Sequence, residues 1–292
     1  MKTVREKRER LAAVAAALTE CYPDAVCALR WAGDPWRLLV MGRLSAQCTD
    51  ARVNLVSEEL FRAFPTPAAM AAAPLPDIEK LVKSCGLYRT KAENIRDASA
   101  MLVSEYGGEL PATMEELLRF PGVGRKIANL LLGDVFGQPA VVTDTHCIRI
   151  CGRLGMYPED ERDPYRVEKV LTGLIDPQGS ADFCHRIVQF GRDFCTARAP
   201  KCEACPLAAR GLCEKRLREG RTAQRAAEKR PGKAGGTDGQ AGAAAATAGK
   251  AGGDKTGKSK NGKSKNGKSK NGKRNTGKNK TEKRGGGAHR GG

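Results

Sequence analysis

Residues 118–129 read Leu-Arg-Phe-Pro-Gly-Val-Gly-Arg-Lys-Ile-Ala-Asn, and this stretch constrains the fold more than any other part of the chain. Two glutamates precede two leucines just before it, as in the first turn of a short helix. Pro121 ends that helix, because a proline disfavours the helical conformation for the residue before it. From Arg125 onward, apolar residues return at helical spacing, at positions 127, 130, 131 and 135. The pattern predicts a helix, a tight turn and a second helix.

The predicted turn between these helices is suited to binding a phosphate. Gly122 and Gly124 allow the backbone to approach a ligand closely. The amides at the start of the second helix point outward and carry a partial positive charge. Arg125 and Lys126 lie in the first turn of that helix, beside whatever the turn binds.

Pro-Gly-Val-Gly-Arg-Lys, at residues 121–126, resembles the helix-hairpin-helix of the endonuclease III family of DNA glycosylases. The hairpin alone favours plain binding over catalysis, because many proteins use one only to hold the DNA backbone. The resemblance covers roughly residues 5–215, and further stretches carry it. Together they imply an enzyme that removes damaged bases from double-stranded DNA.

Two of those stretches imply side chains that enter the DNA duplex. Leu-Ser-Ala-Gln-Cys-Thr-Asp, at residues 44–50, resembles a family segment whose glutamine fills the gap left by an extruded nucleotide, which implies that role for Gln47. Gly-Leu-Tyr followed by Lys-Ala-Glu-Asn-Ile resembles the segment whose leucine is pushed between base pairs, which implies that role for Leu87. Lys91 is a candidate phosphate contact.

Without the resemblance, plainer interpretations of the same three residues would stand. Gln47 would bond to backbone at a helix end, Leu87 would cover the core from a loop, and Lys91 would be an ordinary solvated lysine. The burial and contacts of these three side chains distinguish the DNA-contact roles from the plainer interpretations.

A third stretch, Val-Thr-Asp-Thr-His at residues 142–146, contains a candidate catalytic acid. Asp144 stands where a helix cap belongs, so a cap is its plain structural interpretation. The common form in the family is Val-Asp-Thr-His, with a catalytic aspartate that faces the lysine across a cleft. Here Thr143 replaces the valine, and the Asp-Thr-His register is kept. The resemblance implies that Asp144 is catalytic and that His146 orders the cleft or touches a phosphate.

Lys126 determines which reaction the resemblance implies. Relatives that remove adenine carry serine at this position, whereas a primary amine can attack the deoxyribose C1′, expel the base and leave a Schiff base. β-Elimination then breaks the strand on the 3′ side of the lesion. The amine must be unprotonated, and Arg125 and the helix N-terminus are expected to disfavour its ammonium form. As a carboxylate, Asp144 would stabilise the positive charge that develops on the sugar.

Four cysteines lie close together near residue 200 and form a candidate metal site: Cys195, Cys202, Cys205 and Cys213. Four thiolates can enclose one soft metal centre, and their spacing alone does not separate zinc from an iron–sulfur cluster. The family carries a 4Fe-4S cluster on C-x6-C-x2-C-x5-C, and the first two gaps match. The last gap is seven residues here, so Cys213 is the least secure ligand. The resemblance implies a 4Fe-4S cluster, with zinc as the alternative.

The remaining composition bears on the compartment in which the protein works. The eleven cysteines show no even disulfide framework, and Cys147 with Cys151 is interpreted as a pair of small core hydrophobes. Residues 5–20 are expected to form an amphipathic helix rather than a secretory signal. No run of about twenty apolar residues is present, so no membrane span is expected. A reducing cytoplasm, with the protein associated with the nucleoid, is the expected location.

The positive charge of the chain is concentrated at its C-terminal end. The formal net charge is +18, from 51 Lys and Arg against 33 Asp and Glu. Residues 221–292 hold 20 of these bases and 4 of these acids, which leaves 31 bases and 29 acids in residues 1–220. Any DNA-binding face on the folded part must therefore be a local patch.

From about residue 217 the sequence becomes rich in Lys, Gly and Ala, and it includes three Gly-Lys-Ser-Lys-Asn repeats. Because it lacks aromatic residues and an apolar period, residues 217–292 are predicted to be disordered. Their lysines are expected to bind nucleic acid non-specifically. Solubility, RNA and an acidic partner remain alternatives for this tail.

These observations predict an all-α fold of two helical lobes. Residues 28–138 would form a helical barrel that carries the hairpin, and residues 1–27 with 139–216 would form a lobe around the iron–sulfur cluster. The predicted function is a monomeric, bifunctional DNA glycosylase and AP lyase of base excision repair, acting on oxidised pyrimidines and abasic sites. A non-catalytic DNA-binding protein and an adenine-mismatch glycosylase are the alternatives.

Overall fold

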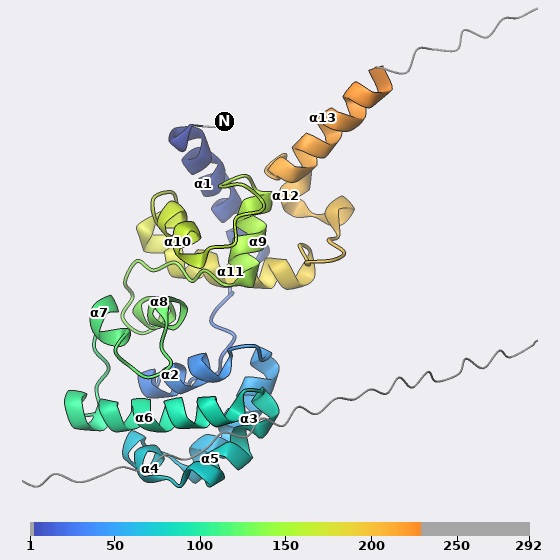
Figure 1. Ribbon diagram of the computed structural model, residues 1–292. Helices are drawn as coiled ribbons and strands as arrows, with labels where there is room; N and C mark the ends of the chain where they lie inside the picture. Colours follow the sequence, from blue (N-terminus) through green and yellow to red (C-terminus); the bar gives the residue numbers. More distant parts are fainter. Residues whose placement is uncertain (1–2, 229–292) are drawn as a thin grey trace, which may run out of the picture. The chain divides into compact units, whose positions relative to one another are not determined.

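The computed structural model describes residues 3–228, and every regular element in that range is a helix (Figure 1). The prediction of an all-α fold is confirmed. In the described part of the chain, no helix is long and apolar enough to cross a membrane. The predicted nucleic-acid binding by the tail concerns residues that lie mostly outside this range.

One hydrophobic core is formed by the middle of the chain. It contains residues of α2 (Pro35–Leu44), α3 (Asp50–Ala63), α4 (Pro67–Ala72), α5 (Leu75–Val82), α6 (Tyr88–Tyr106), α7 (Met114–Leu117) and α8 (Arg125–Asp134). Helix α6 packs against α2 on one side and against α4 and α5 on the other (Figure 1). The Trp36 indole is buried here, packs edge-on against Phe61 and donates a hydrogen bond to Ser99 Oγ at 2.9 Å.

A second core joins the N-terminal helix to the helices of residues 145–209. It contains residues of α1 (Val4–Cys21), α9 (Thr145–Arg153), α10 (Pro164–Thr172), α11 (Ser180–Asp193) and α12 (Pro206–Ala209). Cys147 and Cys151 are both buried in it, as predicted. The chain passes from the first core to the second between Ala140 and Val141. This pattern agrees with two lobes, whereas the boundaries at 28–138 and 139–216 stay predictions.

The helices begin at the cap residues that the sequence supplies. Helix α1 starts with a capping box between Thr3 and Glu6, and α3 starts with a Thr49 side chain that accepts from the Arg52 amide. Helices α4 and α10 each have a proline as their first residue, after Thr66 or Asp163 as N-cap. Proline suits that position because its missing N–H has no partner there anyway.

The predicted start of disorder at residue 217 is wrong for residues 217–228. Helix α13 runs over Glu214–Glu228. Within it Arg216 pairs with Glu219 at 3.2 Å, and Arg221 reaches back to Glu214 at 2.8 Å. Ion pairs about one and two turns apart, among residues with good helix propensity, extend the helix beyond the last core residue. The prediction for residues 229–292 lies outside the described part of the chain.

Candidate active site and iron–sulfur centre

Gly122 forms the tight part of the hairpin, between the end of α7 and the start of α8. Its φ of 75° lies in the left-handed region, which glycine adopts without steric cost. A Cβ at this position would also lie 2.5 Å from Arg43 Nε and 2.6 Å from Asn94 Oδ1. Arg43 Nε donates to Asn94 Oδ1 at 2.8 Å, so this hydrogen-bonded pair packs against the turn at Gly122. Asn94 belongs to the Lys-Ala-Glu-Asn stretch at residues 91–94, but nothing in the sequence indicates that it pairs with Arg43.

Gly124, by contrast, borders open space. It is the N-cap of α8, has no side chain to cap the helix, and an added Cβ would meet nothing within 4 Å. The first amides of a helix have no intrahelical acceptor, so those of Arg125 and Lys126 are available to an anion. The Lys126 side chain, in the first turn, is exposed. The hairpin therefore has the geometry of a phosphate site with an amine at its edge.

The Arg125 side chain is paired with a carboxylate of α10. Its Nε donates to Glu168 Oε2 at 2.9 Å and its Nη2 to Oε1 at 2.5 Å. The hydrogen bonds to the buried Glu168 carboxylate raise the pKa of Arg125, and the guanidinium stacks 5.1 Å from the Tyr165 ring. This ion pair connects the hairpin to α10. A DNA contact by Arg125 stays a prediction.

Asp144 is the N-cap of α9, which confirms the plain interpretation of this residue. Its Oδ1 accepts a hydrogen bond from the Cys147 amide at 2.7 Å, and the side chain is half-buried. A cap of this kind holds the carboxylate in one orientation and leaves Oδ2 out of that bond. Helices α8 and α9 both pack against α11. That Asp144 faces Lys126 across a cleft stays a prediction.

His146 is held inside the second lobe. Arg149 Nη2 donates to its Nδ1 at 3.2 Å, and the same nitrogen donates to the Cys195 carbonyl at 2.9 Å. Gly191 leaves room for the ring, because a Cβ there would collide with His146. Burial lowers the pKa of His146, so the ring is neutral near pH 7. The contacts support an ordering part for His146, and the predicted phosphate contact stays untested.

Gln47 and Leu87 lie on two loops and share an unusual backbone conformation. Both are exposed residues other than glycine with positive φ, 53° at Gln47 and 47° at Leu87. Leu87 is 58% exposed, so the interpretation in which it covers the core is wrong. Such strained conformations persist only where surrounding structure enforces them, and they gather at functional sites.

The prediction that Lys91 contacts a phosphate is wrong, and so is the plainer interpretation as a solvated lysine. Its side chain is fully buried. Its Nζ donates to the carbonyl oxygens of Leu44 at 2.8 Å, Ala46 at 2.6 Å and Cys85 at 2.8 Å. With three donors engaged by three acceptors, the ammonium is satisfied inside the protein. It has no path to a DNA backbone.

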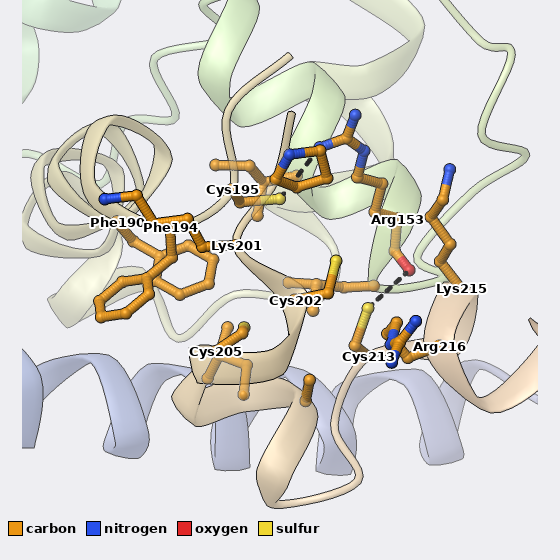
Figure 2. A pocket seen from close by; sticks show the side chains of 15 residues that line it. Arg153, Phe190, Phe194, Cys195, Lys201, Cys202, Cys205, Cys213, Lys215 and Arg216 are labelled. Atoms are coloured by element: carbon orange, nitrogen blue, oxygen red, sulfur yellow. Dashed lines mark hydrogen bonds between the residues drawn. The ribbon is translucent and has the colours of Figure 1, made fainter. Parts of the chain in front are cut away.

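The four predicted ligand cysteines line one apolar cavity, around which Figure 2 shows them arranged. Arg153, Lys215 and Arg216 also line it, and Arg153 Nη1 donates to Cys195 Sγ at 3.2 Å. Cations beside thiolates offset the negative charge of a cysteine-bound cluster. Burial raises the pKa of Cys205 and of Cys213, so both stay protonated until a metal centre displaces the protons.

The donors of this cavity fit an iron–sulfur cluster. Four cysteine thiols line it together with apolar side chains, and thiolates are the usual ligands of such clusters. The same four donors would also suit zinc. Cys213 lines the same cavity despite its longer spacing.

Comparison with known proteins places this geometry in a family. Residues 40–177 match the description "HhH-GPD superfamily base excision DNA repair protein", and residues 195–210 match "Iron-sulfur binding domain of endonuclease III". Endonuclease III of Bacillus subtilis is 42% identical over 188 residues, which cover 64% of this chain and 85% of the relative. Endonuclease III of Synechocystis is 42% identical over 209 residues, or 71% and 94%. The chain belongs to the endonuclease III family.

Solved structures of endonuclease III agree with this membership. A non-covalent endonuclease III–DNA complex has a TM-score of 0.68 and 39% identity, and covers 76% of this chain and 100% of the other. A trapped endonuclease III–DNA covalent intermediate has a TM-score of 0.67 and the same identity, over 75% and 99%. As an endonuclease III, the protein is a base excision repair enzyme that is both DNA glycosylase and AP lyase, and it carries a 4Fe-4S cluster. The alternatives of a binding-only protein and an adenine-mismatch enzyme are set aside.

Proposed function

We propose that Lys126 is the nucleophile of this endonuclease III. The observation that carries the proposal is an exposed primary amine in the first turn of α8, beside a hairpin whose amides are uncapped. A phosphate bound by those amides would hold the sugar of the damaged nucleotide near the amine. Nζ attacks C1′, the C1′–N bond breaks, and the base leaves with a proton. The C1′–O4′ bond then breaks as the sugar ring opens, O4′ takes up a proton, and a Schiff base is left between Nζ and C1′. The Schiff base acidifies the hydrogen at C2′, whose loss expels the 3′ phosphate by β-elimination.

Asp144 is the proposed partner of this amine. Its carboxylate would stabilise positive charge on the sugar and accept or return protons during the two steps. The bond from the Cys147 amide to Oδ1 supports this role, because a carboxylate fixed by a helix cap is oriented before the substrate arrives. Oδ2 would be the oxygen that faces the sugar.

Gln47 and Leu87 are the proposed side chains that separate the target nucleotide from its stack. Their exposure and their strained backbone support a role outside the core. Oxidised or ring-saturated pyrimidines stack and pair poorly, so their extrusion costs less than that of an intact base. We therefore infer these lesions, together with abasic sites, as substrates.

The proposed cluster ligands are Cys195, Cys202, Cys205 and Cys213. When bound, the 4Fe-4S cluster would supply a covalent cross-link among segments that otherwise share little core. Arg153 holds the segment that follows Cys195, because its guanidinium donates to the carbonyls of Thr196 at 2.8 Å and Ala197 at 3.0 Å. Purified protein should contain iron and inorganic sulfide in equal amounts.

Further proposals concern the setting in which the enzyme works. We propose a monomer, because a single chain holds the amine, the acid and the candidate cluster ligands. It would act on chromosomal DNA in the cytoplasm, at the nucleoid. The basic residues 229–292 would add non-specific contacts to nucleic acid, which raises affinity most at low salt.

Covalent trapping tests the assignment of Lys126. With borohydride present, the wild type should form a reduced, stable adduct with duplex DNA that contains thymine glycol or an abasic site. Lys126→Ala should lose the adduct and strand cutting by roughly 10³-fold or more, since no general acid or base can replace the nucleophile. Lys80→Ala, which changes an exposed lysine of α5, is the control. A Lys126→Ala protein that still traps and cuts would overturn the assignment.

A further inference from the structure

One ammonium joins the two loops that carry Gln47 and Leu87. Leu44 ends α2 and Ala46 precedes Gln47, and the carbonyl oxygens of both accept hydrogen bonds from Lys91 Nζ, at 2.8 and 2.6 Å. The third acceptor, the Cys85 carbonyl at 2.8 Å, ends the short helix η1 (Lys83–Cys85), two residues before Leu87. The acceptors are 47, 45 and 6 residues from Lys91 in sequence, so the contact is mainly tertiary.

Lys91 also lies on the element that begins at Leu87. Leu87 is the N-cap of α6, and Lys91 stands one turn into that helix, where its amide donates to the Leu87 carbonyl at 3.0 Å. The side chain of Lys91 therefore fixes α6 to the end of α2, and its backbone fixes it to Leu87. At the end of α2 the positive charge also meets carbonyls that have no intrahelical partner.

A residue that only filled the core would not need a charged ammonium group with three hydrogen-bond donors. Burying an ammonium is costly, and an apolar side chain of similar length fills the same volume at less cost. The ammonium adds directional hydrogen bonds, which fix the positions of three carbonyl groups relative to Lys91 Nζ. Those carbonyls lie within three residues of Gln47 or Leu87, which hold left-handed conformations. Such conformations need enforcement from neighbouring groups.

We propose that Lys91 is a positioning residue for nucleotide extrusion, which sets the spacing and backbone conformation of the Gln47 and Leu87 loops. The inference rests on the proposed function, in which those two side chains enter the duplex. Lys91 itself touches neither DNA nor the reacting atoms. It acts by holding both loops ready before DNA binds, so that binding energy is not spent on ordering them.

The variant Lys91→Met tests the proposal, because it keeps the length of the side chain and removes the three donors. Single-turnover cutting is measured on two substrates, an abasic site in duplex DNA and the same site in a single-stranded oligonucleotide, which needs no extrusion. Each rate is divided by that of the wild type. The duplex rate should fall about tenfold to a hundredfold, as for a small misplacement of positioning groups. The single-strand rate should stay within about twofold of the wild type, since Lys126 and Asp144 are unchanged.

A fluorescent base next to the lesion gives the second measurement. 2-Aminopurine brightens when it loses its stacking partner, so its amplitude reports extrusion without chemistry. Lys91→Met should lower that amplitude. Ser99→Ala is the matched control, because it removes a buried hydrogen-bonding group from the same helix α6, at the Trp36 indole instead of at the loops. It should leave the ratio of duplex to single-strand rates unchanged.

Equal losses on both substrates, or no loss on either, would overturn the proposal. Should Lys91→Met not fold, as judged by circular dichroism and iron content, Lys91→Gln goes through the same assays, because its amide can still bond to one or two of the carbonyls. If neither variant folds, Lys91 is a core residue and the proposal is wrong. Gln47→Ala with Leu87→Ala tests the proposed function separately. Unchanged extrusion in that double variant would refute the insertion roles, whatever Lys91 does.

Discussion

At the scale of single residues, the two glycines of the hairpin differ in what they do. Gly122 meets two conditions that exclude a side chain. Its backbone is left-handed, and atoms of Arg43 and Asn94 would lie within 2.7 Å of an added Cβ. Gly124 meets neither, since its φ is −106° and its surroundings are open. One is required by the fold, and the other leaves a free approach to the amides of α8.

The same substitution at both glycines should therefore have different effects. Gly122→Ala should lower the free energy of unfolding by about 2–4 kcal/mol, from the left-handed conformation and the overpacking together. Gly124→Ala should change the free energy of unfolding by less than about 1 kcal/mol, because restriction of the unfolded chain and the poorer N-cap preference of alanine oppose each other. Its methyl group should instead weaken DNA binding by obstructing the phosphate. Urea unfolding and fluorescence anisotropy measure the two quantities, and a Gly124→Ala protein with unchanged affinity would contradict the phosphate site.

At the scale of elements, helix α9 combines a structural and a proposed chemical task in one carboxylate. Asp144 caps the helix through Oδ1. Asparagine caps helices about as well as aspartate, whereas alanine costs roughly 0.5–2 kcal/mol. Asp144→Asn should keep the free energy of unfolding near that of the wild type and still lose base excision, because the charge is gone. Asp144→Ala should lose both. If Asp144→Asn retains full activity, the residue is a cap and nothing more.

At the scale of the whole molecule, stability should depend on pH through His146. Burial lowers the pKa of this ring below the usual 6.5, although the Asp144 carboxylate opposes the shift and Arg149 and Arg192 add to it. The unfolded chain then binds its proton first as the pH falls, so stability is fully present above pH 6.5 and decreases through the folded-state pKa. His146→Gln should have a flatter profile between pH 7.5 and pH 5. Denaturant midpoints over that range measure the difference, and parallel profiles for the two proteins would exclude His146 as the source.

Local features of the molecule were predictable because local chemistry sets them. The caps at Thr49 and Asp144 and the Pro-Gly break at 121–122 depend on residues within a few positions. The spacing of the cysteines likewise indicates one metal centre. The N-caps followed by proline at the first helical position, before α4 and α10, carry the same kind of local signal.

The sequence by itself determined an all-helical chain, its hairpin and the family from which its chemistry follows. Only the tertiary structure determined which groups the charged ends of the long side chains contact. Lys91 bonds to carbonyls up to 47 residues away, and Arg125 pairs with Glu168 across 43 residues. A lysine or arginine can reach water, phosphate or a buried acceptor from the same backbone position. Which of these it meets depends on distant segments that come together only when the chain folds.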